Sequence, residues 1–210
     1  MPYLTREQPA DESIACRILT AALELFVQDG YHRVSVHDIQ KEAGVSIGSI
    51  YNHYGGKEGV ARGLYRHLLQ ELEGVIEQAT RETDSPADQC ELLIRRFFEF
   101  TETRRDIMAF VFATRHREFL PEEPPICNST PFMRLRDIVA RAMQRGEFRR
   151  MDPWVAAATV FGGAIRLMQL RLDGLIETSL PELADELIAT TWAGVAADAA
   201  PQAAAGQTGL

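Results

Sequence analysis

Apolar residues recur every three or four positions along nearly the whole chain of 210 residues. The first stripe contains Ile14, Ile18, Ala22 and Leu25, and it ends before Gly30, a residue suited to a left-handed C-terminal cap. The sequence has no internal repeat and no Asn-Gly hairpin signal. This pattern predicts an all-α fold with about nine helices.

Capping residues and glycines divide the chain into separate helices. Asp11 is a candidate N-cap for the first helix, and Ser35 with Asp38 forms a capping-box-like pair before the second. Gly44 ends the second helix and a glycine pair at 55–56 ends the third. The run IMAFVFA would also suit a buried strand, but its helical surroundings favour a helix. The helices expected after the first cover residues 36–43, 46–54, 57–82, 86–103, 105–119, 130–145, 152–173 and 181–198.

Charge divides the chain into a head and a body. Residues 1–67 contain 7 Lys and Arg against 8 Asp and Glu, a net charge of −1, and the remainder contains 15 against 22, a net charge of −7. A near-neutral head can still bind phosphates if its few cations face one way. Arg6 alone gives the N-terminal arm a cation, so we expect no strong minor-groove anchoring. We expect a head at 1–67, a body at 68–198 and a disordered tail at 199–210.

The composition is that of an ordinary soluble protein, with 46% hydrophobic and 25% charged residues. No apolar stretch reaches roughly 18 residues and no secretory signal is visible, so we expect no membrane partner. Cys16, Cys90 and Cys127 are far apart and lack CxxC spacing, which argues against disulfides and metal sites and fits the cytoplasm. A redox role for Cys90 or Cys127 rests on residue type alone. Catalytic and phosphate-loop motifs are missing, so we expect neither an enzyme nor a cofactor.

The segment 35–54 carries the clearest functional pattern. Its two short helices flank Gly44 and Val45, a tight turn in which the glycine can adopt a positive φ. Ile50 and Tyr54 are four residues apart and would face inward, which leaves the rest of the second helix facing out. Small side chains near the start of that helix allow a close approach to base edges, and its hydroxyl groups can reach phosphates. The pattern predicts a helix-turn-helix that binds double-stranded DNA.

The stretch FVQDGYHRVSVHDIQKEAGVSIGSIYNHYGGKEGV resembles the signature of the TetR family of transcriptional regulators. The resemblance covers residues 11–67 and implies a three-helix DNA-binding domain followed by a helical domain for ligand binding and dimerisation. It also implies which residues contact DNA, the first two from the second helix and the others from the third helix or just beyond it: Ser35, His37, Ile47, Gly48, Ser49, Tyr51, His53 and Lys57.

These residues would divide the work of binding DNA. Ile47 and its two neighbours would approach base edges, whereas Tyr51 and Lys57 would hold phosphates, as would the histidines at 37 and 53. Each has a plainer alternative. Ser35 could be only a helix cap, Ile47 could pack against the first helix, and the remaining side chains could be ordinary surface groups.

The sequence departs from the family pattern in three places. Gln40 stands where alanine is usual, at the crossing of the two short helices, so its side chain must bend outward or spread the helices. Glycines 55–56 replace a polar cap, and Gly59 takes a position often filled by a bulkier residue. We therefore expect a looser hinge between head and body than is usual in the family.

The body is rich in phenylalanine, and six of the ten in the chain lie between residues 97 and 119. Such a cluster suits either a plain core or a cavity with apolar walls and a few polar anchors. Arg115, His116 and Arg166 are candidate anchors, although salt bridges to body carboxylates would also explain the arginines. If a ligand cavity exists, the residues expected to line it are Phe97, Phe98, Thr101, Met108, Phe112, Arg115, Phe132 and Met168.

The last two helices suit an oligomer interface. The run WVAAATVFGGAIRLMQL is rich in small residues, and a second stripe follows in the final helix. The family resemblance implies that both helices pair with their copies in a four-helix bundle, although monomeric core packing would give a similar stripe. The interface residues expected are Ala157, Gly162, Leu183, Leu187, Thr190 and Gly194.

The function implied is that of a homodimeric repressor, released from its operator by a small, largely apolar effector. Effector binding would bias the long helix at 57–82 and change the separation of the two heads. The alternative is a DNA-binding regulator with a solid body that binds a protein partner instead of a small molecule.

Overall fold

The computed structural model describes residues 2–4 and 13–197. Within these ranges the chain forms nine α-helices, three short 3₁₀ helices and one isolated β-bridge, so the all-α prediction is confirmed. The first helix is capped by Ser13, whose hydroxyl accepts from the Cys16 N–H at 3.2 Å, so the predicted Asp11 cap is wrong. Arg6 and the tail at 199–210 lie outside the described residues. The α-helices are α1 (Ile14–Asp29), α2 (Val36–Ala43), α3 (Ile47–Tyr54), α4 (Lys57–Glu82), α5 (Pro86–Thr103), α6 (Arg105–Phe112), α7 (Thr130–Gln144), α8 (Pro153–Leu172) and α9 (Leu180–Val195), and the 3₁₀ helices are η1 (Tyr31–Arg33), η2 (His116–Glu118) and η3 (Ile126–Asn128).

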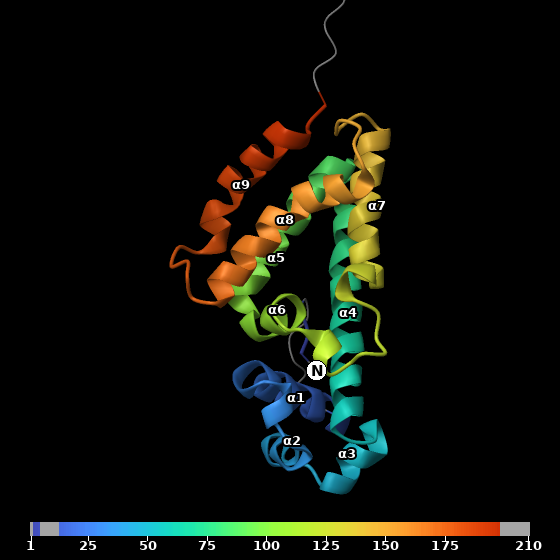
Figure 1. Ribbon diagram of the computed structural model, residues 1–210, viewed down its shortest axis with the longest axis vertical. Helices are drawn as coiled ribbons and strands as arrows, with labels where there is room; N and C mark the ends of the chain where they lie inside the picture. Colours follow the sequence, from blue (N-terminus) through green and yellow to red (C-terminus); the bar gives the residue numbers. More distant parts are fainter. Residues whose placement is uncertain (1, 5–12, 198–210) are drawn as a thin grey trace, which may run out of the picture.

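The helices form an elongated molecule with a small head at one end (Figure 1). Helices α1, α2 and α3 make the head, and α5, α7, α8 and α9 make the far end of the body. The long helix α4 runs from the head into the body, and α6 lies between the two, against α1. A change in the packing of α4 or α6 can therefore reach the head directly.

Local hydrogen bonds fix the two short helices of the head. The Ser35 hydroxyl accepts from the Asp38 N–H at 3.2 Å and the Asp38 carboxylate accepts from the Ser35 N–H at 2.8 Å, which completes the expected capping box. The hydrogen bonds that the Asp38 carboxylate accepts from the Ser35 hydroxyl and from the Ser35 N–H lower the pKa of this carboxyl below its usual range. Gly44 ends α2 in the left-handed region, at φ 59°, and its carbonyl accepts from the Arg17 guanidinium of α1 at 2.8 Å.

Gln40 neither bends away from the crossing nor spreads the helices. Its side-chain amide is half-buried and donates to the Val45 carbonyl at 2.9 Å, across the turn between α2 and α3. The backbone N–H of Val45 returns a hydrogen bond to the Gln40 carbonyl at 3.2 Å. The glutamine therefore ties α2 to the turn, a role that alanine could not fill.

The expected loose hinge after α3 is wrong. A Cβ atom at Gly59 would lie 1.6 Å from the Tyr54 backbone carbonyl oxygen, so α4 starts in direct backbone contact with the end of α3. One turn further along α4, a Cβ at Gly63 would lie 2.7 Å from the Tyr54 ring. Because the two glycines have no side chain, the end of α3 and the Tyr54 ring pack directly against the backbone of α4. The junction between the two helices is therefore tight.

Helix α5 is the centre of the body. It packs against α4, α6, α7, α8 and α9, as expected for a helix that is apolar on two faces. The predicted helix at 105–119 is too long, because α6 ends at Phe112 and the chain turns before the short helix η2. The turn places the His116 ring inside the protein.

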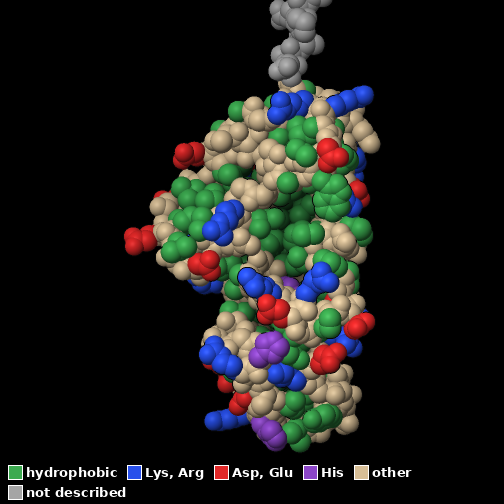
Figure 2. Space-filling view, in the orientation of Figure 1, with side chains coloured by type: hydrophobic (Ala, Val, Ile, Leu, Met, Phe, Trp, Pro, Cys, Tyr) green, Lys and Arg blue, Asp and Glu red, His purple; other side chains and the backbone are tan. Residues whose placement is uncertain are grey.

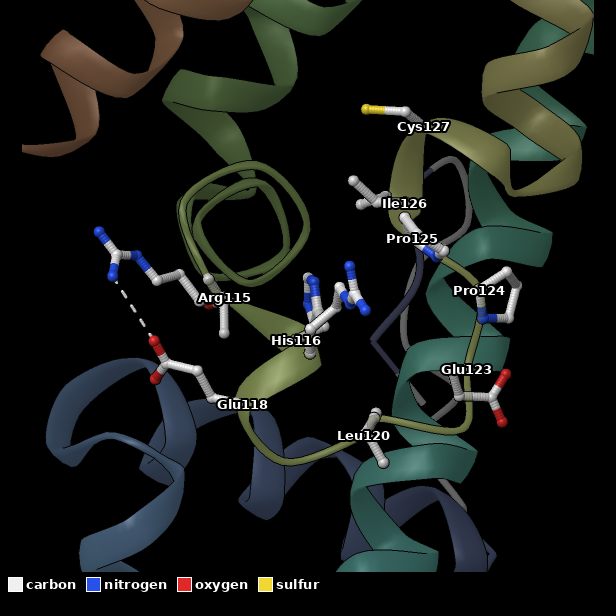
Figure 3. Close-up of a pocket in the computed structure, with 11 residues that line it drawn as sticks. Arg115, His116, Glu118, Leu120, Glu123, Pro124, Pro125, Ile126 and Cys127 are labelled. Atoms are coloured by element: carbon white, nitrogen blue, oxygen red, sulfur yellow. Dashed lines mark ion pairs between the residues drawn. The ribbon is translucent and has the colours of Figure 1, made fainter.

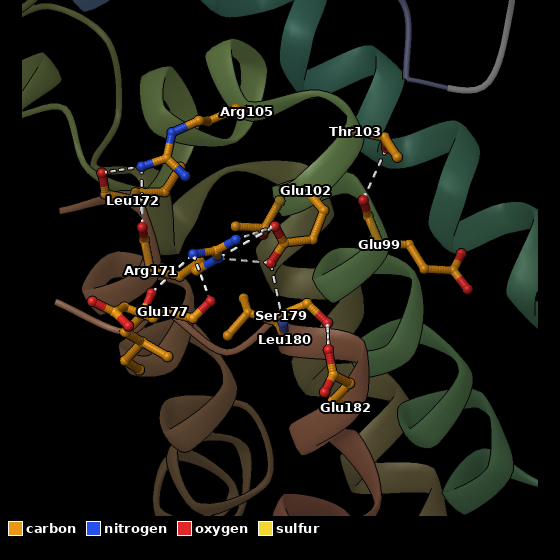
Figure 4. A network of polar contacts seen from close by, with 12 residues as sticks. Glu99, Glu102, Thr103, Arg105, Arg171, Leu172, Glu177, Ser179, Leu180 and Glu182 are labelled. Carbon is orange, nitrogen blue, oxygen red and sulfur yellow. Dashed lines mark hydrogen bonds and ion pairs between the residues drawn. The ribbon is translucent and has the colours of Figure 1, made fainter. Parts of the chain in front are cut away.

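A polar network holds the turn between α8 and α9 against α5 (Figure 4). Glu102 of α5 accepts from the Arg171 guanidinium at 2.9 Å and from the Leu180 N–H at 3.0 Å. The same guanidinium donates to the Ile176 carbonyl at 2.9 Å. The Arg171 partner lowers the pKa of the Glu102 carboxyl, with help from the Leu180 N–H. The network fixes the antiparallel pair α8–α9 relative to the rest of the body.

Helix α8 has an unusual combination of apolar composition and exposure. Among the described residues it is the one helix long and apolar enough to cross a membrane, with 28% of the tested window buried in the chain. It packs against α5, α6, α7 and α9 on its inner side, as the core helix of a globular domain does. Its outer side carries Val155, which is 55% exposed.

Candidate DNA interface and effector site

Helix α3 presents two contrasting faces. Ile50 is completely buried against the head, whereas Tyr51 is 55% exposed and Ile47 is 37% exposed. Tyr54, also predicted to face inward, is half-buried and donates from its hydroxyl to the Ala15 carbonyl of α1 at 3.3 Å. The inward face thus anchors α3 on α1 and α4, and the face with Tyr51 is left to solvent at the tip of the molecule, away from the body (Figures 1 and 2).

The start of α3 is small and polar. Ser46 caps the helix by accepting from the Ser49 N–H at 3.1 Å, and the two hydroxyl oxygens lie 2.8 Å apart. Gly48 is exposed, and a Cβ there would meet only ordinary contacts, so folding does not require a glycine at this position. Because Gly48 has no side chain, another molecule could approach the backbone closely next to Ile47.

The remaining predicted DNA contacts have different surroundings. His37 on α2 and His53 on α3 are exposed. Ser35 is exposed too, but its hydroxyl is committed to Asp38, to which it also donates at 2.6 Å.

Lys57 lies at the predicted place, yet its ammonium is engaged inside the head. It donates to the Tyr31 carbonyl at 2.8 Å and to the Val34 carbonyl at 2.7 Å, and it lies 4.1 Å from the centre of the Tyr31 ring. Partial burial lowers its pKa. Lys57 therefore clamps the segment between α1 and α2 onto the start of α4.

The same tyrosine joins the head to the body. The Tyr31 ring stacks on Phe119, which follows η2, with centroids 4.3 Å apart and an interplanar angle of 14°. Stacked rings at this distance contribute beyond their buried area. Sequence reasoning did not single out this pair, because the two residues lie far apart in the chain and only Tyr31 belongs to the family signature.

Most of the predicted cavity residues form solid core. Five of the eight are at most 2% exposed and line neither of the pockets described below, because neighbouring helices fill the space around them: Phe97, Phe98, Thr101, Met108 and Met168. The half-buried Phe112 lies between Phe97 and Phe132, with ring centroids 5.9 and 5.7 Å away. Arg166, a proposed anchor, is exposed and lines neither pocket.

Two neighbouring pockets open on the body. The first, the body groove, lies between α7 and α8, has a volume of about 200 Å³ and is lined by Phe132, Phe161 and Ile165 among others. Figure 2 shows the hollow in the body lined largely by hydrophobic side chains. Arg136 lies 4.2 Å from the Trp154 ring, and both line this groove. A groove with these walls suits an apolar molecule.

The second, the loop pocket, lies between η2 and the segment before α7 and has a volume of about 370 Å³ (Figure 3). It is lined by residues 114–118, Leu120 and residues 123–127, and Cys127 also lines the body groove. Arg115 reaches the loop pocket as a rim residue, because its side chain is 86% exposed and pairs with Glu118 at 3.6 Å.

The cysteines differ in reactivity. Burial raises the pKa of the Cys90 thiol well above its usual range, so this thiol stays protonated and does not suit redox sensing. Cys127 is exposed at the edge of both pockets.

The outer face of α8 and α9 is open in the single chain. Leu183, Leu187 and Thr190 line a groove of about 280 Å³ along these helices. Cβ atoms added at Gly162 or Gly194 would meet nothing within 4 Å. Of the six predicted interface residues, Ala157 differs, because it lines the body groove beside Phe161.

Comparison with known proteins supports the assignment of the head. Residues 18–64, which include all of α2 and α3, match the family model described as bacterial regulatory proteins, tetR family. Over these residues the chain matches the TetR family.

Several relatives of this chain carry the names of regulators. The fatty acid metabolism regulator protein of Bacillus subtilis is 29% identical over 82 residues, 39% of this chain and 42% of that protein. An HTH-type transcriptional regulator of Mycobacterium tuberculosis, named as uncharacterized, is 31% identical over 120 residues, 56% of this chain and 61% of that protein. The chain thus spans about half the length of these curated relatives.

Solved structures share the whole fold. The structure of the regulator FadR from Bacillus subtilis in complex with stearoyl-CoA has a TM-score of 0.70 and 21% identity, over 85% of this chain and 97% of that one. At this identity the likeness establishes the arrangement of helices, from the head to α9.

His116 is a buried histidine at the edge of the loop pocket. It is 7% exposed and packs against the rings of Tyr65 and Phe110, each with centroids 4.9 Å away. Burial lowers its pKa to about 4, although a hydrogen bond to the Phe110 backbone opposes the shift. The ring is therefore neutral near pH 7.

Folding stability should fall between pH 7 and pH 5 because of this histidine. The unfolded chain takes up the proton near pH 6.5 and the folded chain only near pH 4, so acid favours unfolding across that window and the full stability is present above it. We expect a loss of about 2 kcal/mol in the free energy of unfolding, measured by urea titration at both pH values. His116→Phe should remove most of this loss, and an unchanged pH dependence in that variant would contradict the assignment.

Proposed function

We propose that this protein is a homodimeric DNA-binding repressor of the cytoplasm, released from its operator by a small, largely apolar effector. The observation that carries the proposal is the free outer face of α3, where Tyr51 is 55% exposed while Ile50, one residue before it, is fully buried. A helix held this firmly on one side and open on the other can enter a major groove without rearrangement of the head.

DNA recognition would begin at the start of α3. Ile47, Gly48 and Ser49 would meet base edges, with Ile47 against a thymine methyl group, and Tyr51 and His53 would reach the phosphates on either side of the groove. Lys57 would act indirectly, because its ammonium holds the Tyr31 and Val34 carbonyls and so places α4 against the head. Backbone N–H groups at the start of α4 would then supply the phosphate contact.

The effector would bind in the body. The body groove has apolar walls, and FadR, which has the same fold, was solved with stearoyl-CoA, a molecule with a long apolar chain. Helix α6 touches both α8 of the groove and α1 of the head, so a ligand that favours one position of α6 would shift the head. A ligand with equal affinity for both positions would change nothing.

The exposed α8–α9 face would form the dimer. Its half-buried leucines and its glycines open to solvent suit a four-helix bundle with a second copy. Two-fold symmetry would then place two α3 helices against half-sites about one DNA turn apart, roughly 34–36 Å.

Tyr51→Ala tests the proposed DNA face. We expect the dimer to lose about 100-fold in operator affinity, because each copy gives up one hydrogen bond to a phosphate, a loss of about tenfold per half-site. Fluorescence anisotropy with a labelled operator measures the change. Leu175→Ala is the control, since Leu175 is 72% exposed in the turn after α8, and it should bind as the wild type does. Equal affinities for the two variants, with both folded, would refute the role of α3.

A further inference from the structure

The loop pocket contains one buried polar group without a partner. His116 Nε2 is fully shielded from solvent and has no hydrogen-bond partner among the described residues, although the side chain lines the pocket. Figure 3 shows His116 between Arg115 on one side and Leu120, Pro124 and Pro125 on the other. An unpaired buried polar atom costs free energy of folding, which a ligand that pairs with it would recover.

The form of the ring decides what it can bind. Since the ring is neutral near pH 7 and its hydrogen bond to the Phe110 backbone uses the other nitrogen, Nδ1 carries the proton. Nε2 is therefore a hydrogen-bond acceptor with a free lone pair. It can accept from an O–H or N–H group, and it offers nothing to a carboxylate.

The charges around the loop pocket cancel. Arg115 pairs with Glu118, and the Glu123 carboxylate accepts from the Arg66 guanidinium at 2.8 Å and lies 3.6 Å from that of Arg62. Apart from these rim groups and His116, most of the lining is apolar, with Leu120, the prolines at 124–125 and Ile126. Over the whole lining, the two arginines Arg115 and Arg117 are balanced by the two glutamates Glu118 and Glu123, so no net charge favours an ion and the pocket suits an uncharged molecule.

We propose that the loop pocket is a binding site for an uncharged, mostly apolar molecule with a hydroxyl or N–H donor, which His116 accepts at Nε2. This site is separate from the body groove of the proposed function, and its test needs no DNA. The proposed site and the proposed function can therefore be refuted independently. A ligand in this pocket would contact η2, which forms one wall, and the adjacent Phe119 stacks on Tyr31 of the head. Binding in the loop pocket could therefore affect the position of the head.

Two isomeric probes isolate the hydrogen bond. 1-Octanol and methyl heptyl ether have the same atoms and nearly the same shape, but the ether has no donor; octanoate adds a negative charge. With the full-length protein at pH 7, calorimetric titration should show 1-octanol binding about 3- to 10-fold more tightly than the ether, the effect of one neutral hydrogen bond, and octanoate binding more weakly than 1-octanol.

Two variants assign the preference to the site. His116→Phe keeps an aromatic ring between Tyr65 and Phe110 and should bind both isomers equally. Ala158→Trp fills the body groove, which Ala158 lines, and should leave the preference for 1-octanol unchanged.

A measurement on the wild type avoids dependence on any variant. In ¹⁵N spectra of the histidine rings, 1-octanol should shift the Nε2 signal of His116 and the ether should not. Failure of both isomers to bind at millimolar concentration, equal binding by the wild type, tighter binding of octanoate, or a preference that persists in His116→Phe would each overturn the proposal. So would loss of 1-octanol binding in Ala158→Trp, which would place the site in the body groove.

Discussion

Gly59→Ala should destabilise the protein by about 3 kcal/mol, the upper end for overpacking, because the added methyl group meets backbone. Its Cβ would lie 1.6 Å from the Tyr54 carbonyl oxygen, an atom that cannot move without shifting α3 or α4. Either shift turns the α3 face that the proposed function places in the major groove. We therefore expect operator affinity to fall together with stability, measured by urea titration and fluorescence anisotropy.

Gly74→Ala is the matched control in the same helix. Gly74 is exposed, and a Cβ there would meet nothing within 4 Å. Replacing glycine by alanine in an open helical position should stabilise the protein by about 1 kcal/mol and leave operator binding unchanged. If Gly59→Ala were as stable as the wild type, the tight junction between α3 and α4 would be wrong.

Thr190→Arg should give a monomer and reduce operator affinity by about 100-fold or more. Thr190 is exposed and lines the groove on the open α8–α9 face, so arginine is tolerated in the single chain but places a charge at the proposed interface. A monomer loses the second half-site and with it the gain in affinity from joined binding modules. Sedimentation velocity measures the oligomeric state, and anisotropy measures the affinity.

Ala189→Arg provides the control for this substitution. Ala189 is the preceding exposed residue of α9 and does not line the groove, so the same charge is added on a different row of the helix. We expect a dimer with unchanged operator affinity. A wild-type protein that sediments as a monomer at micromolar concentration would count against the dimer altogether.

Local signals made the head predictable from the sequence. Ser35 with Asp38, Gly44 and the spacing of Ile50 and Tyr54 each act within a few residues, and the structure places the caps, the turn and the buried face of α3 as expected. The bounds of the helices in the body could also be predicted from the sequence, except at the end of α6. There the buried His116 and the prolines that follow it interrupt the periodic pattern.

Contacts between distant residues were not predictable in this way. The sequence shows Gly59 but not its contact with the Tyr54 carbonyl, so a tight junction was predicted to be a loose hinge. It shows Lys57 but not the Tyr31 and Val34 carbonyls that accept from its ammonium, so a partly buried contact was predicted to be a free cation. Likewise a phenylalanine such as Phe98 has the same pattern in a core as in a cavity wall. Only the packing of the neighbouring helices against the buried faces of α5 separates the two.

Selection of bound duplexes from a random pool, at moderate salt and with the purified wild-type protein, tests the central claim most directly. If two α3 helices read DNA as a pair, the selected sequences should converge on two inverted half-sites with centres about one helical turn apart, 10–10.5 base pairs. A pool that remains random after repeated rounds, from protein shown to be folded, would contradict the account.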